Sequence, residues 1–236
     1  MPVNADHIAT PGTLYLVSTP IGNLEDITFR AVRMLREADL IAAEDTRRTR
    51  QLLDHYHISA RLTSYHDHNK EQRSPRLLET LLAGRSVALV SDAGTPGISD
   101  PAYYLVRLAI QKDVPVVPIP GPASPLAALV VSGLPPDRFI FEGFLPVKAG
   151  KRRSRLRDLT DEPRTIVLFE SPHRLLKTLQ DIRDIMGDRP AAVVRELTKK
   201  FEEVSRGPVS RLIAAYGERK PRGEFVIVLG GRPVST

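Results

Sequence analysis

The sequence predicts an α/β protein of two domains, and three observations support this. Short apolar runs alternate with segments of helical periodicity, which is typical of a parallel sheet covered by helices. The 236 residues suffice for two modest domains. The stretch Pro118–Pro125 holds four prolines and a glycine, a composition typical of a domain boundary. We therefore expect a flexible tail (1–11), an N-terminal domain with a parallel sheet (12–120) and a C-terminal domain with a mixed sheet (121–236).

The first half of the chain shows the clearer alternation of elements. The expected strands cover Leu14–Val17, Leu40–Ala43, Ser86–Val90 and Val114–Ile119. The expected helices cover Ile27–Ala38 and Thr46–Tyr56, then a segment that stops near Gly84, then one that begins at Pro101. Asp45 and Asp100 are suited to cap the helices that follow them. The prolines of Val114–Ile119 indicate an edge or an end of a strand.

The second half repeats the pattern less regularly. The expected strands cover 139–141, 165–169, 191–195, 204–205 and 225–229, and the expected helices cover 126–132, 172–186 and 209–216. Between them, Lys148–Arg157 holds six basic residues and no acid. Such a block suits phosphate contacts, although a solvated helix face or loop is an equally good interpretation.

Composition excludes several classes of function. The chain contains no cysteine, which excludes disulfides, thiolate zinc sites, iron–sulfur clusters and a cysteine nucleophile. The net charge of +6 is by itself a weak indication of nucleic-acid binding. No apolar run has the length that spans a bilayer, and the first ten residues lack a signal-peptide core. We expect a cytoplasmic protein without a membrane partner.

Four loops that follow predicted strands are the candidate site. They cover 18–23, 44–48, 91–97 and the proline-rich junction. In an open parallel sheet ligands bind beyond the carboxyl ends of the strands, so these loops are expected to converge. Their Gly, Pro, Ser, Thr and Asp residues let the backbone approach a ligand closely, although ordinary turn chemistry explains any single loop.

Common nucleotide and hydrolase motifs are absent from the sequence. There is no G-x-x-x-x-G-K-[ST], the run Gly94–Gly97 does not match G-x-G-x-x-G, and no serine occupies a G-x-S-x-G elbow. The spacing of His66 and His68 fits a metal site on a strand, but a polar surface loop is the favoured interpretation. No metal is expected.

At these loops and beyond, the chain resembles the tetrapyrrole methylase superfamily. The resemblance is to the branch that methylates a cytidine 2′-hydroxyl in the decoding region of small-subunit (16S) ribosomal RNA. The segments that show it are Gly12–Thr28, Ala43–Arg47, Ser91–Pro101, Pro120–Pro122, Ser132–Pro135, Phe141–Pro146, Phe169–Arg174, Arg195–Lys199 and Gly223–Phe225. They extend over nearly the whole chain.

The resemblance implies two α/β domains of the tetrapyrrole methylase type, with S-adenosylmethionine in the interdomain cleft, and a homodimer. Gly94-Thr95-Pro96 corresponds to the G-D-P cofactor loop of the porphyrinoid methylases, with Thr95 in place of the aspartate. Ala123-Ser124-Pro125 departs from the usual Ser-Ala after Pro-Gly-Pro. The residues expected to bind the cofactor are Thr19, Pro20, Ile21, Asp92, Gly94, Thr95, Ile98, Ser99, Ser124, Phe169 and Phe225.

The expected reaction is an in-line displacement of a methyl group by a ribose hydroxyl. That hydroxyl is a poor nucleophile at neutral pH, so a base or a stabilising cation should assist it. We hypothesise that Glu170 or Glu196 accepts the proton and that Arg195 or Lys199 stabilises the oxyanion. For each of these residues a structural salt bridge or a phosphate contact is the alternative.

The expected partner is small-subunit ribosomal RNA or the 30S subunit, and not DNA. The residues expected to face RNA are Arg47, Arg48, Arg50, Lys148, Lys151, Arg152, Arg153, His173 and Arg174. The target cytidine is expected to be unstacked, as in base-flipping enzymes. Two alternatives are a methylase that acts on a porphyrinoid and a non-catalytic ribosome-binding module, which would need no cofactor pocket.

Overall fold

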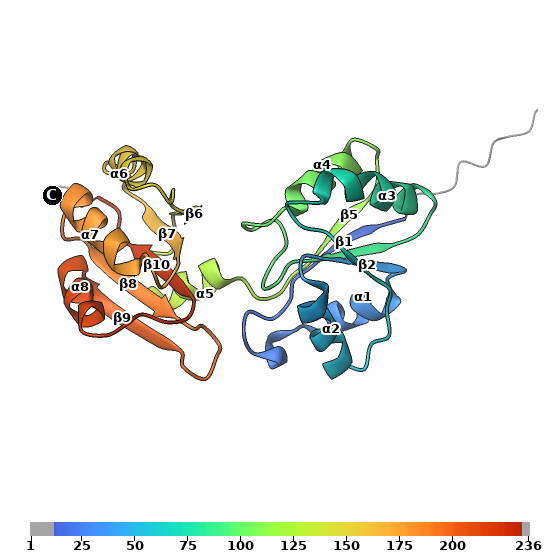
Figure 1. Ribbon diagram of the computed structural model, residues 1–236, viewed down its shortest axis with the longest axis horizontal. Coiled ribbons are helices and arrows are strands. Elements are labelled where there is room, and N and C mark those ends of the chain that lie inside the picture. The colour runs from blue at the N-terminus through green and yellow to red at the C-terminus, as the bar shows by residue number, and fades with distance from the viewer. Residues whose placement is uncertain (1–11, 233–236) are drawn as a thin grey trace, which may run out of the picture. The chain divides into compact units, whose positions relative to one another are not determined.

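A computed structural model describes residues 12–232. The chain divides into two compact units, residues 1–123 and 124–236, so the division falls within the proline-rich segment. The tail expected over residues 1–11 lies outside the described residues. Each unit contains a five-stranded sheet with helices on both of its faces (Figure 1).

The sheet of the first unit is entirely parallel. Its strands are β1 (Leu14–Val17), β2 (Leu40–Ala43), β3 (Leu62–Ser64), β4 (Val87–Val90) and β5 (Val116–Ile119), in the order β3-β2-β4-β1-β5. The prolines predicted an edge or an end of a strand, and β5 is an edge strand, where Pro118 need not donate to a further strand. The sequence pattern did not reveal β3, which has only three half-buried residues.

Helices cover both faces of this sheet. They are α1 (Phe29–Glu37), α2 (Thr46–His55), α3 (Lys70–Leu82) and α4 (Ala102–Ile110), with the short 3-10 turn η1 (Leu24–Asp26) before α1. Helices α3 and α4 lie on one face and α1 and α2 on the other, each pair closing its own apolar cluster (Figure 1). Asp45 caps α2, as predicted, by accepting a hydrogen bond from Arg47 N–H. Asp100 likewise accepts from Ala102 N–H at the start of α4.

The second unit has a mixed sheet. Its strands are β6 (Phe139–Phe144), β7 (Thr165–Glu170), β8 (Pro190–Arg195), β9 (Glu203–Pro208) and β10 (Phe225–Leu229), in the order β6-β7-β10-β8-β9. Only β6 and β7 pair in parallel; the other neighbours are antiparallel. The carboxyl ends of β7 and β8 therefore both lie beside the first residue of β10, Phe225, because Glu170 and Arg195 are its partners.

Four helices enclose this second sheet, namely α5 (Ser124–Ser132), α6 (Ala149–Asp158), α7 (Leu175–Met186) and α8 (Val209–Gly217). Helix α5 packs on one face through Ala128 and Leu129, while α6, α7 and α8 close a larger cluster on the other. Helix α7 begins three residues later than the sequence suggested, because residues Ser171–Arg174 form a turn. Among the described residues no helix is long and apolar enough to cross a membrane.

Candidate cofactor site and catalytic loop

The strand-end loops of the first unit meet at one edge of its sheet, as predicted. Thr19, just after β1, and Gly94, after β4, exchange two backbone hydrogen bonds of 2.9 and 3.0 Å. The Thr19 hydroxyl also donates to the Ser91 carbonyl at 3.4 Å. Two of the four expected loops are thus joined through their main chains, which fixes the position of the side chains between them.

The proline-rich junction joins the same edge. The Thr95 hydroxyl lies 3.0 Å from Ser18 Oγ and donates to the Pro122 carbonyl at 3.1 Å. A Cβ added at Gly121 would lie only 2.8 Å from Ser18 Cβ, so this contact requires glycine. Gly94 has φ +83°, a backbone conformation that residues with a Cβ atom rarely adopt. Loops after β1, β4 and β5 therefore pack closely enough to present backbone groups to a ligand.

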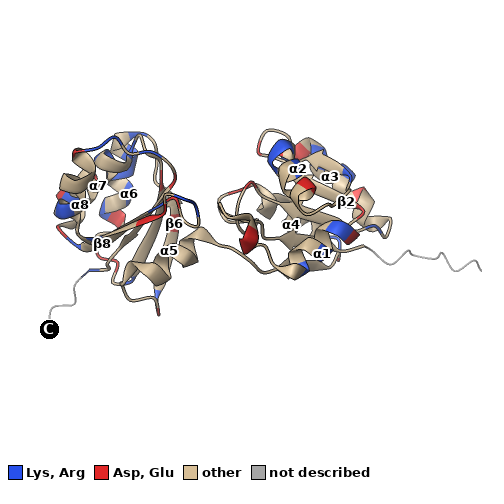
Figure 2. Ribbon diagram, turned by 90° about the horizontal axis from the view of Figure 1, so that it is seen from below, with Lys and Arg blue, Asp and Glu red and all other residues tan. Residues whose placement is uncertain are grey.

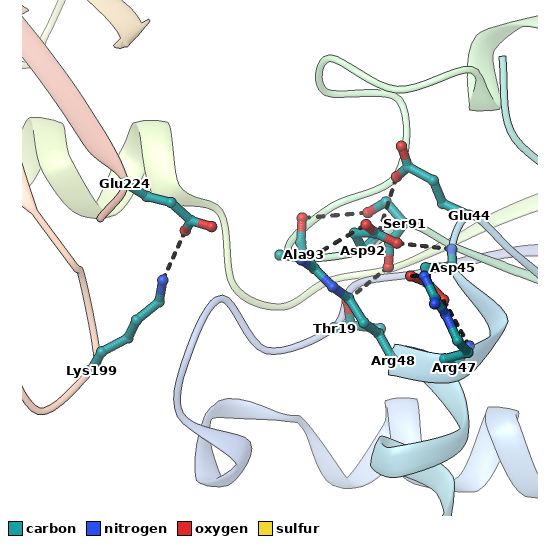
Figure 3. A network of polar contacts seen from close by, with 10 residues as sticks. All are labelled: Thr19, Glu44, Asp45, Arg47, Arg48, Ser91, Asp92, Ala93, Lys199 and Glu224. Carbon is teal, nitrogen blue, oxygen red and sulfur yellow. Dashed lines mark hydrogen bonds and ion pairs between the residues drawn. The ribbon is translucent and has the colours of Figure 1, made fainter. Parts of the chain in front are cut away.

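Carboxylates gather beside these loops (Figure 3). Asp92 accepts a 2.8 Å hydrogen bond from Asp45 N–H and pairs with Arg48 at 3.4 Å. Glu44 accepts from Asp92 N–H at 3.2 Å. Burial raises the pKa of Glu44; that hydrogen bond opposes the shift, and the Asp92 charge adds to it. Asp92 is thus paired with an arginine, whereas Glu44 forms no ion pair within residues 12–232, so the Glu44 carboxylate is a candidate contact for a cationic ligand.

A pocket of about 170 Å³ opens within this edge, lined by Thr19, Pro20, Ser91, Asp92 and Arg48 among others. Of the other residues expected to bind the cofactor here, Ile21 is buried and Ile98 is 42% exposed. Ser99 is exposed and has φ +68°. Glu44 was not among the residues expected to bind the cofactor, although it lies in the segment Ala43–Arg47 that shows the family resemblance.

The remaining candidate cofactor residues belong to the second unit. Phe169 is half-buried at the end of β7, and its ring lies 5.0 Å from that of Phe141 and 5.4 Å from that of Phe144. Ser124 is half-buried at the start of α5. Phe225 instead lies inside the main core, with its ring 5.9 Å from that of Tyr216. Phe169 and Ser124 are thus accessible, whereas Phe225 packs internally.

The candidate catalytic residues Glu196 and Lys199 form a compact cluster after β8. Lys199 Nζ lies 3.0 Å from Glu196 Oε1 and 3.0 Å from Glu224 Oε2, the latter contact being drawn in Figure 3. Burial alone would lower the pKa of Lys199, but the two glutamates outweigh it and raise this pKa above its usual value. Burial alone would raise the pKa of Glu196, but the hydrogen bond from Glu224 N–H and the nearby Lys199 outweigh it, and the pKa is lowered. The cluster therefore holds a firmly charged ammonium beside an ionised carboxylate.

The backbone of this loop is strained. Glu196 and Thr198 adopt φ +50° and +65°, in the left-handed region that non-glycine residues rarely occupy. The Thr198 hydroxyl is buried without a hydrogen-bond partner among the described residues. A Cβ on Gly223 would lie 2.6 Å from the Glu196 side chain, which explains why a glycine precedes Glu224. Strain of this kind is typical of functional loops.

Glu170, the other candidate base, is only 3% exposed and already has several partners. Its carboxylate accepts from Ser171 N–H at 2.7 Å and from the Thr178 hydroxyl, and it pairs with Arg174 at 2.9 Å. Arg174 also donates to the Leu145 carbonyl. Arg195 donates to the Arg222 carbonyl at 2.6 Å, which ties the end of β8 to the segment before β10.

The candidate RNA-facing residues divide into exposed and internal ones. Arg47, Arg48, Arg50, Lys148, Lys151 and His173 are exposed. The structure places Arg152 differently from that expectation: it is 5% exposed and pairs with Asp181 at 2.7 Å. Arg153 shares the same carboxylate at 2.9 Å. Two of the six basic residues of the block thus hold α6 against α7, because both arginines pair with one aspartate of α7.

Within residues 12–232, no group of three or more His, Cys, Asp or Glu side chains is arranged to hold a metal ion. His66 and His68 lie near each other, with ring centroids 6.0 Å apart, and a loop hydrogen bond joins Asn69 to His66. The histidine pair belongs to a polar loop.

Known proteins resemble this chain over most of its length. The family model for Tetrapyrrole (Corrin/Porphyrin) Methylases matches residues 13–213. The ribosomal RNA small subunit methyltransferase I of Halalkalibacterium halodurans is 51% identical over 220 residues, covering 93% of this chain and 76% of that protein. The protein of the same name from Synechocystis is 52% identical over 221 residues, covering 93% and 79%.

Solved structures share the fold at lower identity. Cobalt precorrin-4 methyltransferase superposes with a TM-score of 0.69 at 23% identity, covering 92% of this chain and 94% of that one. Uroporphyrin-III C-methyltransferase from Thermus thermophilus, in complex with S-adenyl homocysteine, gives 0.66 at 23%, covering 93% and 97%. Since the family model matches most of its length and half of its residues are identical in these relatives, the chain belongs to the tetrapyrrole methylase family, in the group of the ribosomal RNA small subunit methyltransferases I.

Proposed function

We propose that the protein transfers a methyl group from S-adenosylmethionine to a cytidine ribose 2′-hydroxyl in the decoding region of small-subunit (16S) ribosomal RNA. The observation that supports this most is the identity of about 50% to relatives named for small-subunit ribosomal RNA methylation. The porphyrinoid enzymes share the fold at only 22–23% identity. RNA is therefore the better substrate proposal than a porphyrinoid.

The residues of the strand-end edge fit S-adenosylmethionine. This cofactor supplies an electrophilic methyl group on a positively charged sulfonium. The Glu44 carboxylate, which has no ion-pair partner within residues 12–232, can supply negative charge to a cation, and a bound cation would offset the burial and the Asp92 charge that raise the pKa of Glu44. The close approach at Gly121 and the conformation of Gly94 keep side chains away from the loop backbones. We assign cofactor binding to this edge, with Thr19, Asp92 and Thr95 as its polar contacts.

In the second unit we assign the acid–base chemistry to Glu196 and Lys199. The Lys199 ammonium keeps its proton at neutral pH, so it can stabilise a developing oxyanion but cannot accept the proton. The Glu196 carboxylate is ionised and can accept it. Glu170 is surrounded by donors, so its contacts favour a supporting role, in which it positions Arg174.

Methyl transfer to small ribosomal subunits that lack the modification tests this proposal. The purified protein is incubated with labelled S-adenosylmethionine and with such subunits, and in parallel with the free RNA and with a porphyrinoid. We expect label on one 2′-O-methylcytidine, mapped by nuclease digestion. Label on the porphyrinoid alone, or cofactor binding without any RNA label, would reject the substrate. Absence of cofactor binding would favour a non-catalytic ribosome-binding module.

We also propose that the protein acts as a homodimer, as the family resemblance implied. Light scattering in solution should then give twice the 26.2 kDa of one chain. A mass equal to one chain at assay concentration would contradict this.

A further inference from the structure

An open pocket of about 610 Å³ lies beside the candidate cofactor site in the first unit. Its wall contains Arg47 and Arg50 from α2, Thr63 and Ser64 from the end of β3, and Arg73 from α3. Ser64 is the partner of Ala43 in the sheet, and Ala43 directly precedes Glu44. The pocket thus opens at the same carboxyl edge as the loops described above, one strand farther out.

The wall of this pocket is basic and contains no acidic residue. Arg47 is tied to Asp45 at 3.0 Å. Arg50 and Arg73 form no ion pair and no side-chain hydrogen bond with any residue of the described range 12–232. Two helices that are separate in sequence therefore contribute unneutralised guanidinium groups to one hollow. Figure 2 shows Lys and Arg in blue on both α2 and α3.

Hydroxyl groups complete the wall. Ser64 Oγ accepts a 3.0 Å hydrogen bond from Asn69 Nδ2, so its own hydrogen remains available for an acceptor. Thr63 and Thr46 also line the pocket. Guanidinium forks combined with hydroxyl donors match the oxygens of a phosphate, which accept several hydrogen bonds at once.

We propose that this pocket binds a backbone phosphate of the RNA strand that contains the target nucleotide. The inference rests on the proposed function, and it names Arg73, Thr63 and Ser64 as RNA contacts in addition to Arg47 and Arg50. A phosphate contact fixes the register of the strand without reading its sequence. Because the pocket adjoins the cofactor edge, a phosphate held there places the neighbouring nucleotides near the site of reaction.

The test compares two double variants of the full chain with equal loss of charge. R50A/R73A removes the unpaired arginines of the pocket. R33A/R76A, the control, removes two exposed arginines from α1 and α3 outside the pocket wall. Binding of a fluorescein-labelled fragment of small-subunit ribosomal RNA is measured by anisotropy over a salt series. We expect R50A/R73A to bind about tenfold more weakly, with a salt slope smaller by about 0.7, as the loss of one phosphate contact predicts.

The control should stay within about twofold of the wild type, which is less than a single charge-assisted contact contributes. R50K/R73K should recover part of the affinity, since lysine keeps the charge but not the fork. Equal losses of RNA affinity in R50A/R73A and R33A/R76A would overturn the proposal that this pocket binds a phosphate of the RNA. Inorganic phosphate that binds the wild type but not R50A/R73A, with RNA affinity unchanged, would instead assign a small phosphorylated ligand and overturn it too.

Failure of the proposed function is a separate result. It appears as absence of methyl transfer by the wild type, whereas failure of the phosphate pocket appears only in the anisotropy of the variants. Circular dichroism melting of each variant shows that it is folded. Calorimetric titration with S-adenosylmethionine shows whether the cofactor edge is intact.

Discussion

Glu196 and Glu170 differ in the burial and the hydrogen-bond partners of their carboxylates. Glu196 retains exposure beside Lys199 in a strained loop, whereas Glu170 is buried among Arg174, Ser171 and Thr178. We predict that E196Q lowers kcat about 100-fold, the lower range for loss of a general base, with little change in Tm. E170Q should instead cost about 2 kcal/mol of unfolding free energy, through lost charge-assisted hydrogen bonds.

Steady-state methyl transfer and urea unfolding of both variants give this comparison. Glutamine keeps the shape and one acceptor oxygen at each position, so the two changes are matched. A loss of turnover in E170Q with full activity in E196Q would assign the base to Glu170 instead.

Glu44 gives a prediction about pH at the edge to which we assign the cofactor. Its pKa is raised above 4.5, chiefly by burial, so the folded protein holds the carboxylate proton more tightly than the unfolded chain. Its contribution to stability is therefore present below pH 4.5 and is lost as the pH rises through the folded pKa. We predict that E44Q has little effect in acid but stabilises the protein at neutral pH. Urea unfolding at about pH 4 and about pH 7 measures this, and a benefit that shrinks as the pH rises would contradict it.

Among the elements, the contact between Gly121 and Ser18 joins the loops after β5 and β1. A methyl group there would lie 2.8 Å from Ser18 Cβ, so one of the loops must move. We predict that G121A costs about 1–3 kcal/mol and weakens cofactor binding, because overpacking displaces the backbone that forms the site. Calorimetric titration and thermal unfolding measure the two effects.

Gly150 offers a matched control for this change. It lies in α6 with no atom within 4 Å of an added Cβ. G150A should therefore leave cofactor binding unchanged and stabilise by up to about 1 kcal/mol, since alanine favours a helix over glycine. Equal effects of G121A and G150A on cofactor affinity would mean that the Gly121 contact does not shape the site.

The elements also show what the sequence could predict. Buried strands such as β1 and β4 were predictable because continuous apolar runs between helices have few other interpretations. The convergence of the loops followed from parallel topology alone. Strand β3 was missed, since three half-buried residues give no period, and so was the pocket wall that it forms. Side-chain partners could not be predicted for a different reason, since the burial of Arg152 against Asp181 depends on how α6 packs on α7.

At the scale of the whole molecule, net charge and charge available to RNA are different quantities. The chain has a net charge of +6, yet several cations of its most basic segment have partners inside the protein. Arg152 and Arg153 pair with Asp181, and Arg155 pairs with Glu142 at 2.6 Å. Lys148, Lys151 and Arg157 are exposed and form no ion pair within residues 12–232.

We predict that K148A/K151A/R157A lowers the salt dependence of RNA binding while R152A/R153A does not. If each exposed cation meets one phosphate, the slope of log affinity against log salt should fall by about 2, at roughly 0.7 for each contact. R152A/R153A leaves a buried carboxylate unpaired and should instead cost about 3 kcal/mol of unfolding free energy. R30A/R33A/R76A removes three exposed arginines of the first unit and is the charge-matched control. A salt slope that falls equally in both triple variants would mean that RNA responds to total charge, whereas a fall confined to K148A/K151A/R157A would place the strand along α6.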